Sequence, residues 1–359
     1  MARRERIGIT ALSDISRIDK APDTYHLGFI LGPRVNAGGR IGDNWIVHPS
    51  HEGLDLTSDR ALDRFTDTRP VDYGAWWFCL MPLSALRRCG LPVPMFLHGD
   101  DIDYGCRLRA AGVPVLSPPG LGLWHGAFRF KFGSALRYYD LRNGLINAAA
   151  HPDVSNLPGV LHILGWIVRD LLVHRYRAAR AALLAVEDFL AGPDQAIGPD
   201  SAGRHRRLRA HVARLPAPHI VAPHAVAPGI TARGPRIELR PGSSLAPPGR
   251  LPRLFLAHAA LVVRALILPR RIKDLVIAGV PNPEVTGGSG YLLALDPKAE
   301  RCIDMRQSRG QVLAMLPRAL WLSLRYGLLR HRAVRRWQQA LPDLRSPARW
   351  QHEFTGGGQ

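Results

Sequence analysis

Apolar residues recur at helical spacing over two long stretches in the second half of this 359-residue chain. Steps of three and four residues place side chains on one face of a helix. The pattern predicts one long helix or two stacked helices over Leu157–Leu190 and a further helix over Gln311–Leu341. In the latter stretch the apolar positions are Leu313, Leu316, Leu320, Leu324 and Leu328.

Short strands, turns and helices alternate in the first half. Residues 1–70 are rich in turns, and Val71–Cys79 has the apolar composition of a strand. Helices are predicted over Pro82–Arg88, His98–Ala111 and Ser134–His151. Two short apolar runs, 275–280 and 290–295, predict a small β element in the second half. We therefore expect an α/β protein with one domain over residues 1–150 and a mainly helical domain over residues 151–359.

The formal charge of +19 is unevenly distributed. Residues 1–150 hold 18 basic and 15 acidic residues, whereas the remaining residues hold 30 and 14. A basic excess of this kind favours an anionic membrane surface, an anionic polymer or nucleic acid. A coding bias that replaces Lys by Arg would explain the preference for Arg but not the imbalance. Because no recognised nucleic-acid-binding motif is present, a nucleic-acid partner is not expected.

Cysteine usage and hydropathy indicate a cytoplasmic protein. Cys79, Cys89, Cys106 and Cys302 have no CxxC spacing, so we expect buried, reduced thiols rather than a disulfide framework or a zinc site. The N-terminus has no apolar segment typical of a signal peptide. The longest apolar run, Leu254–Pro269, is too short to span a bilayer. The chain is expected to lie free in the cytoplasm or peripherally at the inner face of the cell membrane.

Three carboxylates fall within four positions at the start of the predicted helix His98–Ala111. Asp100, Asp101 and Asp103 would repel one another, so one should have a raised pKa unless cations or hydrogen bonds compensate. The cluster is compatible with a general base or a metal site. It is also compatible with the acidic first turn that many helices carry.

Other side chains in Val71–Asn143 could take part in a functional site, and each also has a purely structural interpretation. His125 follows a tryptophan in an apolar segment and could be a metal ligand or a packed core residue. Adjacent residues of a strand point to opposite faces, so one of Trp76 and Trp77 could pack in the core while the other lines a sugar site. Arg142 and Asn143, on a predicted helix, could contact phosphate or bond neighbouring loops.

Together these segments resemble one family, the family 2 glycosyltransferases of the bacterial galactofuranosyltransferase type, which extend cell-wall galactan. The resemblance rests on VDYGAWWFCLMP at 71–82, GLPVPMFLHGDDIDYG at 90–105, PGLGLWH at 119–125 and LRN at 141–143. Weaker matches continue through YRAARAALLAVEDFLAGP at 176–193 and LPDLRSPARWQHEF near the end.

The resemblance implies a GT-A (Rossmann-like) domain and inverting, metal-dependent transfer from a nucleotide-activated sugar, here a UDP-sugar. Asp101 would be the general base, while Asp100 and Asp103 would orient the acceptor or hold Asp101. His125 would bind Mn²⁺ or Mg²⁺ at the diphosphate. The acceptor would be a lipid-linked or cell-wall glycan, and a homo-oligomer is expected. The residues expected to contact substrate are Tyr73, Trp76, Trp77, Asp103 and Arg142.

Some features depart from the family pattern. The nucleotide-binding half with its DxD motif should precede residue 30, where Asp14 is the one candidate. Gly99 and Phe128 stand where relatives can carry Trp. We therefore expect a partial GT-A domain on the acceptor side and little transferase activity from the isolated chain. The alternatives are a non-catalytic protein that binds a membrane surface or a glycan, and a metal-dependent hydrolase that uses Asp100, Asp101 and His125.

Overall fold

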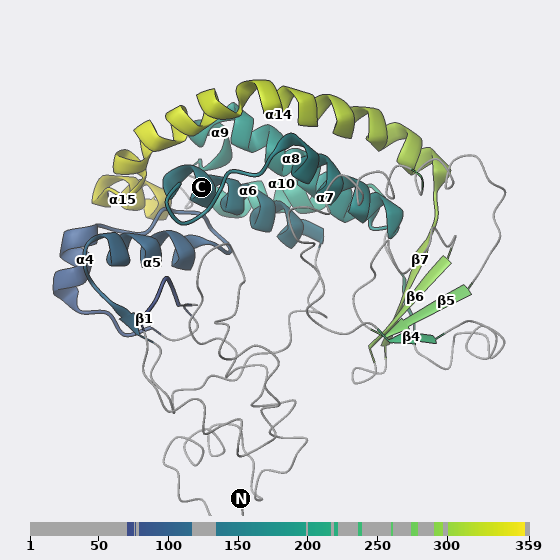
Figure 1. Cartoon of the computed structure of the whole chain (residues 1–359), viewed down its shortest axis with the longest axis horizontal. Helices are drawn as coiled ribbons and strands as arrows, with labels where there is room; N and C mark the ends of the chain where they lie inside the picture. Colours follow the sequence, from purple (N-terminus) through teal and green to yellow (C-terminus); the bar gives the residue numbers. More distant parts are fainter. Residues whose placement is uncertain are drawn as a thin grey trace, which may run out of the picture. The chain divides into compact units, whose positions relative to one another are not determined.

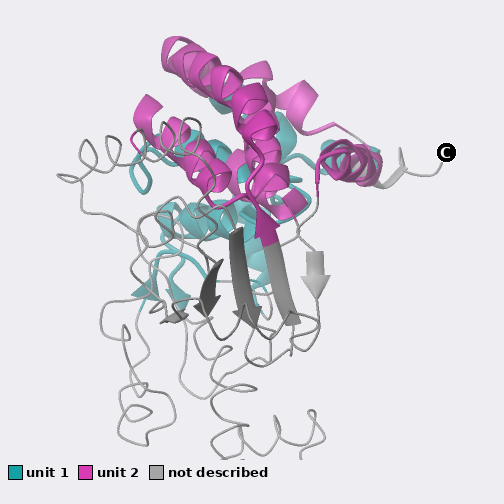
Figure 2. Ribbon diagram, turned by 90° about the vertical axis from the view of Figure 1, so that its right-hand side faces the viewer, with its two compact units in different colours: residues 1–128, 143–157, 337–359 teal, residues 129–142, 158–336 magenta. Residues whose placement is uncertain are grey.

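The computed structural model describes residues 70–116 apart from 75, 77 and 78, residues 134–198 and 200–216, five short strands, and residues 307–355. The described residues are mostly helical, with a small sheet and one pair of two-residue strands (Figure 1). They fall into two compact units, shown in Figure 2. Unit 1 comprises residues 1–128, 143–157 and 337–359, and unit 2 comprises residues 129–142 and 158–336.

Unit 1 is built around two short helices and an antiparallel strand pair. Strand β1 (Pro70–Val71) pairs with β2 (Val115–Leu116), and α4 (Leu83–Cys89) precedes α5 (Asp100–Ala110). Ala85, Tyr104 and Leu108 form a small apolar core between these helices. The strand predicted over Val71–Cys79 is therefore too long, because regular pairing stops at Val71.

Two long helices belong to both units. Helix α6 (Ser134–Ala150) passes from unit 2 into unit 1 at Asn143, and α14 (Arg309–Leu344) does so at Trp337. Helix α15 (Pro347–Thr355) completes unit 1. The domain boundary expected at residue 150 stays a prediction.

Unit 2 is mainly helical, as the periodicity predicted. The stretch Leu157–Leu190 forms two helices, α7 (Val160–Leu172) and α8 (Tyr176–Ala191), which pack on each other. The break lies at His174, whose φ of 60° is left-handed. Helices α9 (Pro193–Ala196) and α10 (Ser201–Ala213) follow and pack on α8. The sequence pattern missed α10, in which only Leu208 and Val212 are buried apolar side chains.

The small β element of unit 2 is a five-stranded mixed sheet in the order β3-β7-β6-β5-β4 (Figure 1). Strands β4, β5 and β6 are parallel, whereas β7 is antiparallel to both β6 and β3. The prediction of strands near 275–280 and 290–295 is confirmed. Their bounds are His219–Val221 (β3), Arg236–Glu238 (β4), Asp274–Ala278 (β5), Tyr291–Asp296 (β6) and Arg301–Arg306 (β7).

The inner face of α14 is buried over the whole helix. Val312, Met315, Ala319, Leu322 and Tyr326 are at most 4% exposed and recur every three or four residues. The leucines that marked this helix in the sequence lie elsewhere. Four of them are exposed, namely Leu313, Leu320, Leu324 and Leu328. Helix α14 thus has two apolar faces, and the more conspicuous one in the sequence faces outward.

The partial GT-A domain expected over residues 1–150 is not tested, because residues 1–69 and 117–133 lie outside the part of the chain that the structure describes. Of the cysteines, Cys79, Cys89 and Cys106 are free thiols, as expected. Cys79 is exposed rather than buried.

Candidate functional site

The loop before α5 has an unusual backbone. Phe96, His98 and Gly99 have φ values of 72°, 59° and 90°, so three of four consecutive residues are left-handed. For a residue with a Cβ atom this conformation costs about 1–2 kcal/mol and persists only where its surroundings hold it. The loop leads directly into Asp100 and Asp101, so its shape determines the position of those two carboxylates.

Two asparagines of α6 hold this loop. The amide nitrogen of Asn143 donates to the carbonyl oxygens of Leu97 at 2.6 Å and His98 at 2.5 Å. One helical turn further on, Asn147 donates to the carbonyl oxygen of Gly99 at 2.9 Å. Both asparagines are at most 2% exposed. Of the two interpretations that the sequence left open for Asn143, bonding to a neighbouring loop is the one observed.

Glycine is required at position 99. Besides its left-handed backbone, a Cβ atom there would lie 3.1 Å from Cβ of Asn143 and 3.2 Å from the amide nitrogen of Asn147. A tryptophan at this position would therefore need a different loop. The departure noted in the sequence is part of the asparagine clamp, by which we mean Asn143 and Asn147 with the loop 96–99.

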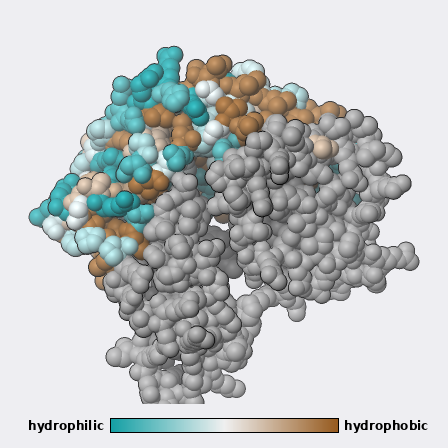
Figure 3. Space-filling view, viewed as in Figure 1, coloured by the Kyte–Doolittle hydropathy of each residue, from teal (hydrophilic) through white to brown (hydrophobic). Residues whose placement is uncertain are grey.

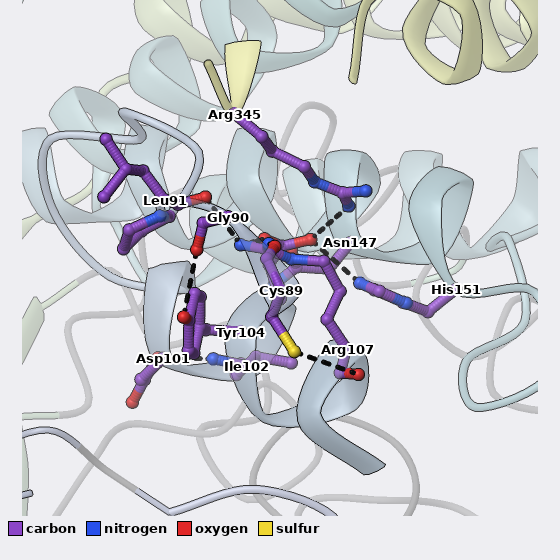
Figure 4. A network of polar contacts seen from close by, with 12 residues as sticks. Cys89, Gly90, Leu91, Asp101, Ile102, Tyr104, Arg107, Asn147, His151 and Arg345 are labelled. Atoms are coloured by element: carbon purple, nitrogen blue, oxygen red, sulfur yellow. Dashed lines mark hydrogen bonds and ion pairs between the residues drawn. The ribbon is translucent and has the colours of Figure 1, made fainter. Parts of the chain in front are cut away.

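Asp103 is the buried member of the acidic cluster. Its side chain has no exposed surface and is bound by three cationic or potentially cationic groups, those of Arg107, His151 and Arg345, which are labelled in Figure 4. His151 Nε2 and Arg345 Nη2 lie 2.9 and 2.8 Å from Oδ1, and Arg107 Nη2 lies 2.9 Å from Oδ2. In this conformation Asp103 contacts protein groups, which leaves its predicted contact with a glycan without support.

The electrostatics of Asp103 follow from these partners. Burial alone would raise the pKa of this carboxyl, but the hydrogen bond with His151 and the charges of Arg107 and Arg345 outweigh it and lower the pKa to about 2. The compensation that the sequence argument required is therefore present. Asp103 stays ionised through the physiological range.

Arg107 connects Asp103 to the segment between α4 and α5. Its guanidinium donates to the carbonyl oxygen of Cys89 and, at 2.9 Å, to that of Leu91. It also lies 4.5 Å from the ring centroid of Tyr104, whose hydroxyl donates to the carbonyl oxygen of Gly90 at 3.0 Å. This network fixes the segment that leads into the left-handed loop.

Asp100 and Asp101 keep part of their surface in solvent. Oδ1 of Asp101 accepts a hydrogen bond from the backbone nitrogen of Ile102 at 2.9 Å. Figure 4 shows the Asp101 carboxylate pointing away from Arg107, His151 and Arg345. Both residues stand in the first turn of α5, where the helix dipole favours negative charge. The structure thus places partly exposed carboxylates on a helix start that the protein holds in position. A general base requires such an accessible and fixed carboxylate.

Two described aromatic residues near the cluster, Tyr73 and Trp76, pack against its surroundings, whereas Phe96 in the preceding loop is exposed. The rings of Trp76 and Tyr104 meet edge to face with centroids 5.2 Å apart, and Trp76 borders the core of Ala85, Tyr104 and Leu108. Trp76 keeps some exposed surface, whereas Tyr73 is 2% exposed. A Cβ atom at position 105 would lie 2.3 Å from Cβ of Tyr73, so α5 approaches Tyr73 as closely as a glycine allows.

Arg142 lies in unit 2 and is 2% exposed. Its guanidinium donates to the carbonyl oxygen of Ala196 at 2.7 Å and lies 5.1 Å from the ring centroids of both Tyr138 and Tyr139. These contacts give Arg142 a role in packing. Its contact with substrate stays a prediction.

His125, Trp77 and Asp14 lie outside the described residues, so the expected convergence of Asp101 and His125 stays a prediction. Within the part of the chain that the structure describes, no three His, Cys, Asp or Glu side chains are grouped to hold a metal ion. The expected Mn²⁺ or Mg²⁺ site is therefore neither supported nor opposed by the described geometry.

Comparison with known proteins finds one kind of relative. No family model matches the chain. Two curated relatives do, both named galactofuranosyltransferase GlfT2. The protein from Mycobacterium tuberculosis (strain ATCC 25618 / H37Rv) is 35% identical over 129 residues, and that from Mycolicibacterium smegmatis (strain ATCC 700084 / mc(2)155) is 36% identical over 128 residues. Part of this chain is related to galactofuranosyltransferases.

The extent of this relationship is limited. Each match covers 34% of this chain and 20% of the relative. The chain thus matches only about a fifth of the length of these curated galactofuranosyltransferases. The similarity supports a transferase ancestry for the matched segment, and the activity of the whole protein is a separate question.

Proposed function

We propose that this chain is a weakly active, inverting glycosyltransferase that transfers galactofuranose from a nucleoside-diphosphate donor, most simply a UDP-sugar, to a lipid-linked or cell-wall glycan. The observation that carries the proposal is the accessible Asp101 on a clamped helix start, in a chain related to galactofuranosyltransferases. The proposed site of action is the cytoplasmic face of the cell membrane, where lipid-linked acceptors are accessible.

In the proposed reaction, one Asp101 carboxylate oxygen takes the proton of an acceptor hydroxyl. The hydroxyl oxygen attacks the anomeric carbon as the bond from that carbon to the diphosphate oxygen breaks, and the nucleoside diphosphate leaves with the electron pair. Attack from the opposite face inverts the anomeric centre. A divalent cation, for which His125 is the expected ligand, would offset the charge that develops on the leaving diphosphate.

The described residues are proposed to position Asp101 and to bind the acceptor. The asparagine clamp fixes the backbone from which Asp101 projects, which keeps the base in one position during proton transfer. The Asp103 network fixes the other side of the same helical turn. Asp100 is proposed to orient the acceptor, and the partly exposed Trp76 to offer an aromatic face to a sugar ring.

The test is a transfer assay on the full chain with UDP-galactofuranose, Mn²⁺ and a galactofuranose oligosaccharide on a lipid carrier. Loss of a general base lowers kcat by about 10²–10⁴-fold. Asp101→Asn should therefore abolish most turnover while leaving the affinity for the acceptor unchanged. The matched control is Asp72→Asn, which removes a carboxylate from an exposed ion pair with Arg109 at the other end of α5.

Three results would contradict the proposal. Full turnover by Asp101→Asn would mean that another group takes the proton. Metal-stimulated release of sugar to water without acceptor would indicate a hydrolase. Saturable acceptor binding without any transfer by the wild-type chain would indicate a glycan-binding protein.

A further inference from the structure

The outer face of α14 in unit 2 carries a continuous apolar stripe. Leu324 and Leu328 are 65% and 84% exposed, and Trp321 is 56% exposed. Figure 3 shows apolar surface along this helix. At 100° per residue the stripe stays within one side of the helix, opposite the buried face. Its members are Leu313, Pro317, Leu320, Trp321, Leu324 and Leu328.

The stripe continues as a basic surface. Beyond Leu328 the same side of α14 presents the exposed residues His331, Arg332 and Arg335. In the middle of the apolar part, the guanidinium of the exposed Arg325 lies 5.2 Å from the ring centroid of Trp321. The helix sequence from Arg309 to Pro342 contains seven arginines and no acidic residue. The face is thus about 22 Å of apolar side chains followed by cationic ones.

We propose that this face of α14 docks the protein on an anionic phospholipid bilayer. Leucine and tryptophan side chains enter the boundary between headgroups and acyl chains, and arginine binds lipid phosphate. This combination of an apolar stripe, an interfacial tryptophan and basic residues is the pattern of a helix that lies in a membrane interface. The inference goes beyond the transfer reaction and does not depend on it.

The charge distribution argues against a second copy of the chain as the occupant. If two such faces packed antiparallel, the arginines of each would be buried against the leucines of the other without a counter-charge, which is costly. If they packed parallel, the two basic ends would meet and repel. Anionic lipid supplies both an apolar phase and the missing negative charge.

Docking on the surface fits better than crossing the bilayer. By length and composition, α14 is apolar enough to span a membrane. Its inner face, however, is covered by protein, as Leu322 and Tyr326 have no exposed surface. Arg318, on its flank, makes a bidentate ion pair with Glu187 of α8, with nitrogen–oxygen distances of 2.6–2.9 Å. Spanning would require these contacts to break.

The experiment is co-sedimentation of the full chain with vesicles of phosphatidylcholine alone or mixed equally with phosphatidylglycerol. We expect binding to the anionic vesicles that falls steeply as salt rises to about 0.5 M. Two exposed arginines near the surface contribute about thirtyfold in partition, so Arg332→Gln with Arg335→Gln should weaken binding by that factor. Leu324→Gln with Leu328→Gln should weaken it at least as much.

The matched control is Leu80→Gln with Leu83→Gln, which removes two leucines of unit 1 that are 83% and 58% exposed. This variant should bind vesicles as the wild type does, and thermal melting should show all variants folded. Unchanged binding by the Leu324/Leu328 variant would overturn the proposal. So would equal binding to neutral vesicles, retention in the membrane after high-salt and alkaline washing, or loss of self-association in the same variant on light scattering.

Discussion

Replacing Asp103 by asparagine tests whether the buried carboxylate organises unit 1. The substitution keeps the volume but leaves the side chains of Arg107, Arg345 and His151 without their common anion. Removing one partner of a buried ion pair costs about 3–5 kcal/mol. Because the Arg345 side chain is 22% exposed and can be partly rehydrated, we expect a loss of unfolding free energy near the lower end, about 3 kcal/mol at pH 7.

The same residue makes a pH-dependent prediction. The pKa of Asp103 is lowered from 3.8 to about 2, so its ionisation stabilises the folded state above pH 4 and this contribution is lost as the pH falls towards 2. The shift corresponds to about 2 kcal/mol. The difference in stability between wild type and Asp103→Asn should therefore be constant above about pH 5 and shrink by about that amount by pH 2.

The assay is urea unfolding at a series of pH values, combined with hydrogen exchange of the peptide that covers α5. Asp72→Asn again serves as the control, because the exposed ion pair with Arg109 is worth about 0–1 kcal/mol. Two results would refute the reasoning: a loss below about 1 kcal/mol for Asp103→Asn at pH 7, or a difference from wild type that does not change between pH 5 and 2.

Two further substitutions, one of them compared with a second glycine variant as a control, probe the approach to the site. Gly105→Ala would place Cβ 2.3 Å from Cβ of Tyr73, so we expect the free energy of unfolding in urea to fall by about 3 kcal/mol. At Gly165 a Cβ atom would meet no atom within 4 Å, so Gly165→Ala should stabilise α7 by up to about 1 kcal/mol. Equal effects of the two glycine variants would contradict this packing. Asn143→Ala removes the donor to two loop carbonyls, so kcat in the transfer assay should fall about tenfold through displacement of Asp101, with acceptor KM unchanged. A rise in KM alone would mean that Asn143 acts on substrate binding instead.

The helices were the most predictable part of the fold, because the spacing of apolar residues and the residues that end helices indicate the same segments. Ser134–His151 was predicted and α6 ends one residue earlier, before Pro152. The sequence did not predict helix α10, because α10 lacks an apolar periodicity. Its stability comes from a cap by Asp200 on the backbone nitrogen of Gly203 and from a few contacts with α8, not from an apolar stripe.

Periodicity did not indicate which face of α14 the protein covers. The leucines at steps of three and four residues define a face as clear as the one formed by Val312, Met315, Ala319, Leu322 and Tyr326. The buried face mixes small, β-branched and aromatic residues, as packing against neighbouring helices requires. Hydropathy alone ranks the leucine face higher, so only the tertiary structure distinguishes the two.

At the site, the sequence identified the acidic cluster but not its supports. Only Asn143 belongs to the LRN segment that carries the resemblance, although Asn147, four residues further along the predicted helix, shares its face. Buried polar side chains on a common helical face indicate a backbone segment that needs hydrogen-bond donors. That signal was available in the spacing, whereas the left-handed loop that uses the donors was not.

The geometry of one helical turn explains how three neighbouring aspartates coexist. Residues 101 and 103 are about 200° apart around a helix, so the first carboxylate is partly exposed while the second faces the interior. Cations neutralise Asp103 within the protein, and Asp101 keeps part of its surface in solvent. The repulsion expected from the sequence is thereby divided between two environments. A carboxylate that is accessible, and attached to a helix whose opposite side is anchored by ion pairs, can exchange a proton without the helix moving, and this is why the proposed base is Asp101 rather than Asp103.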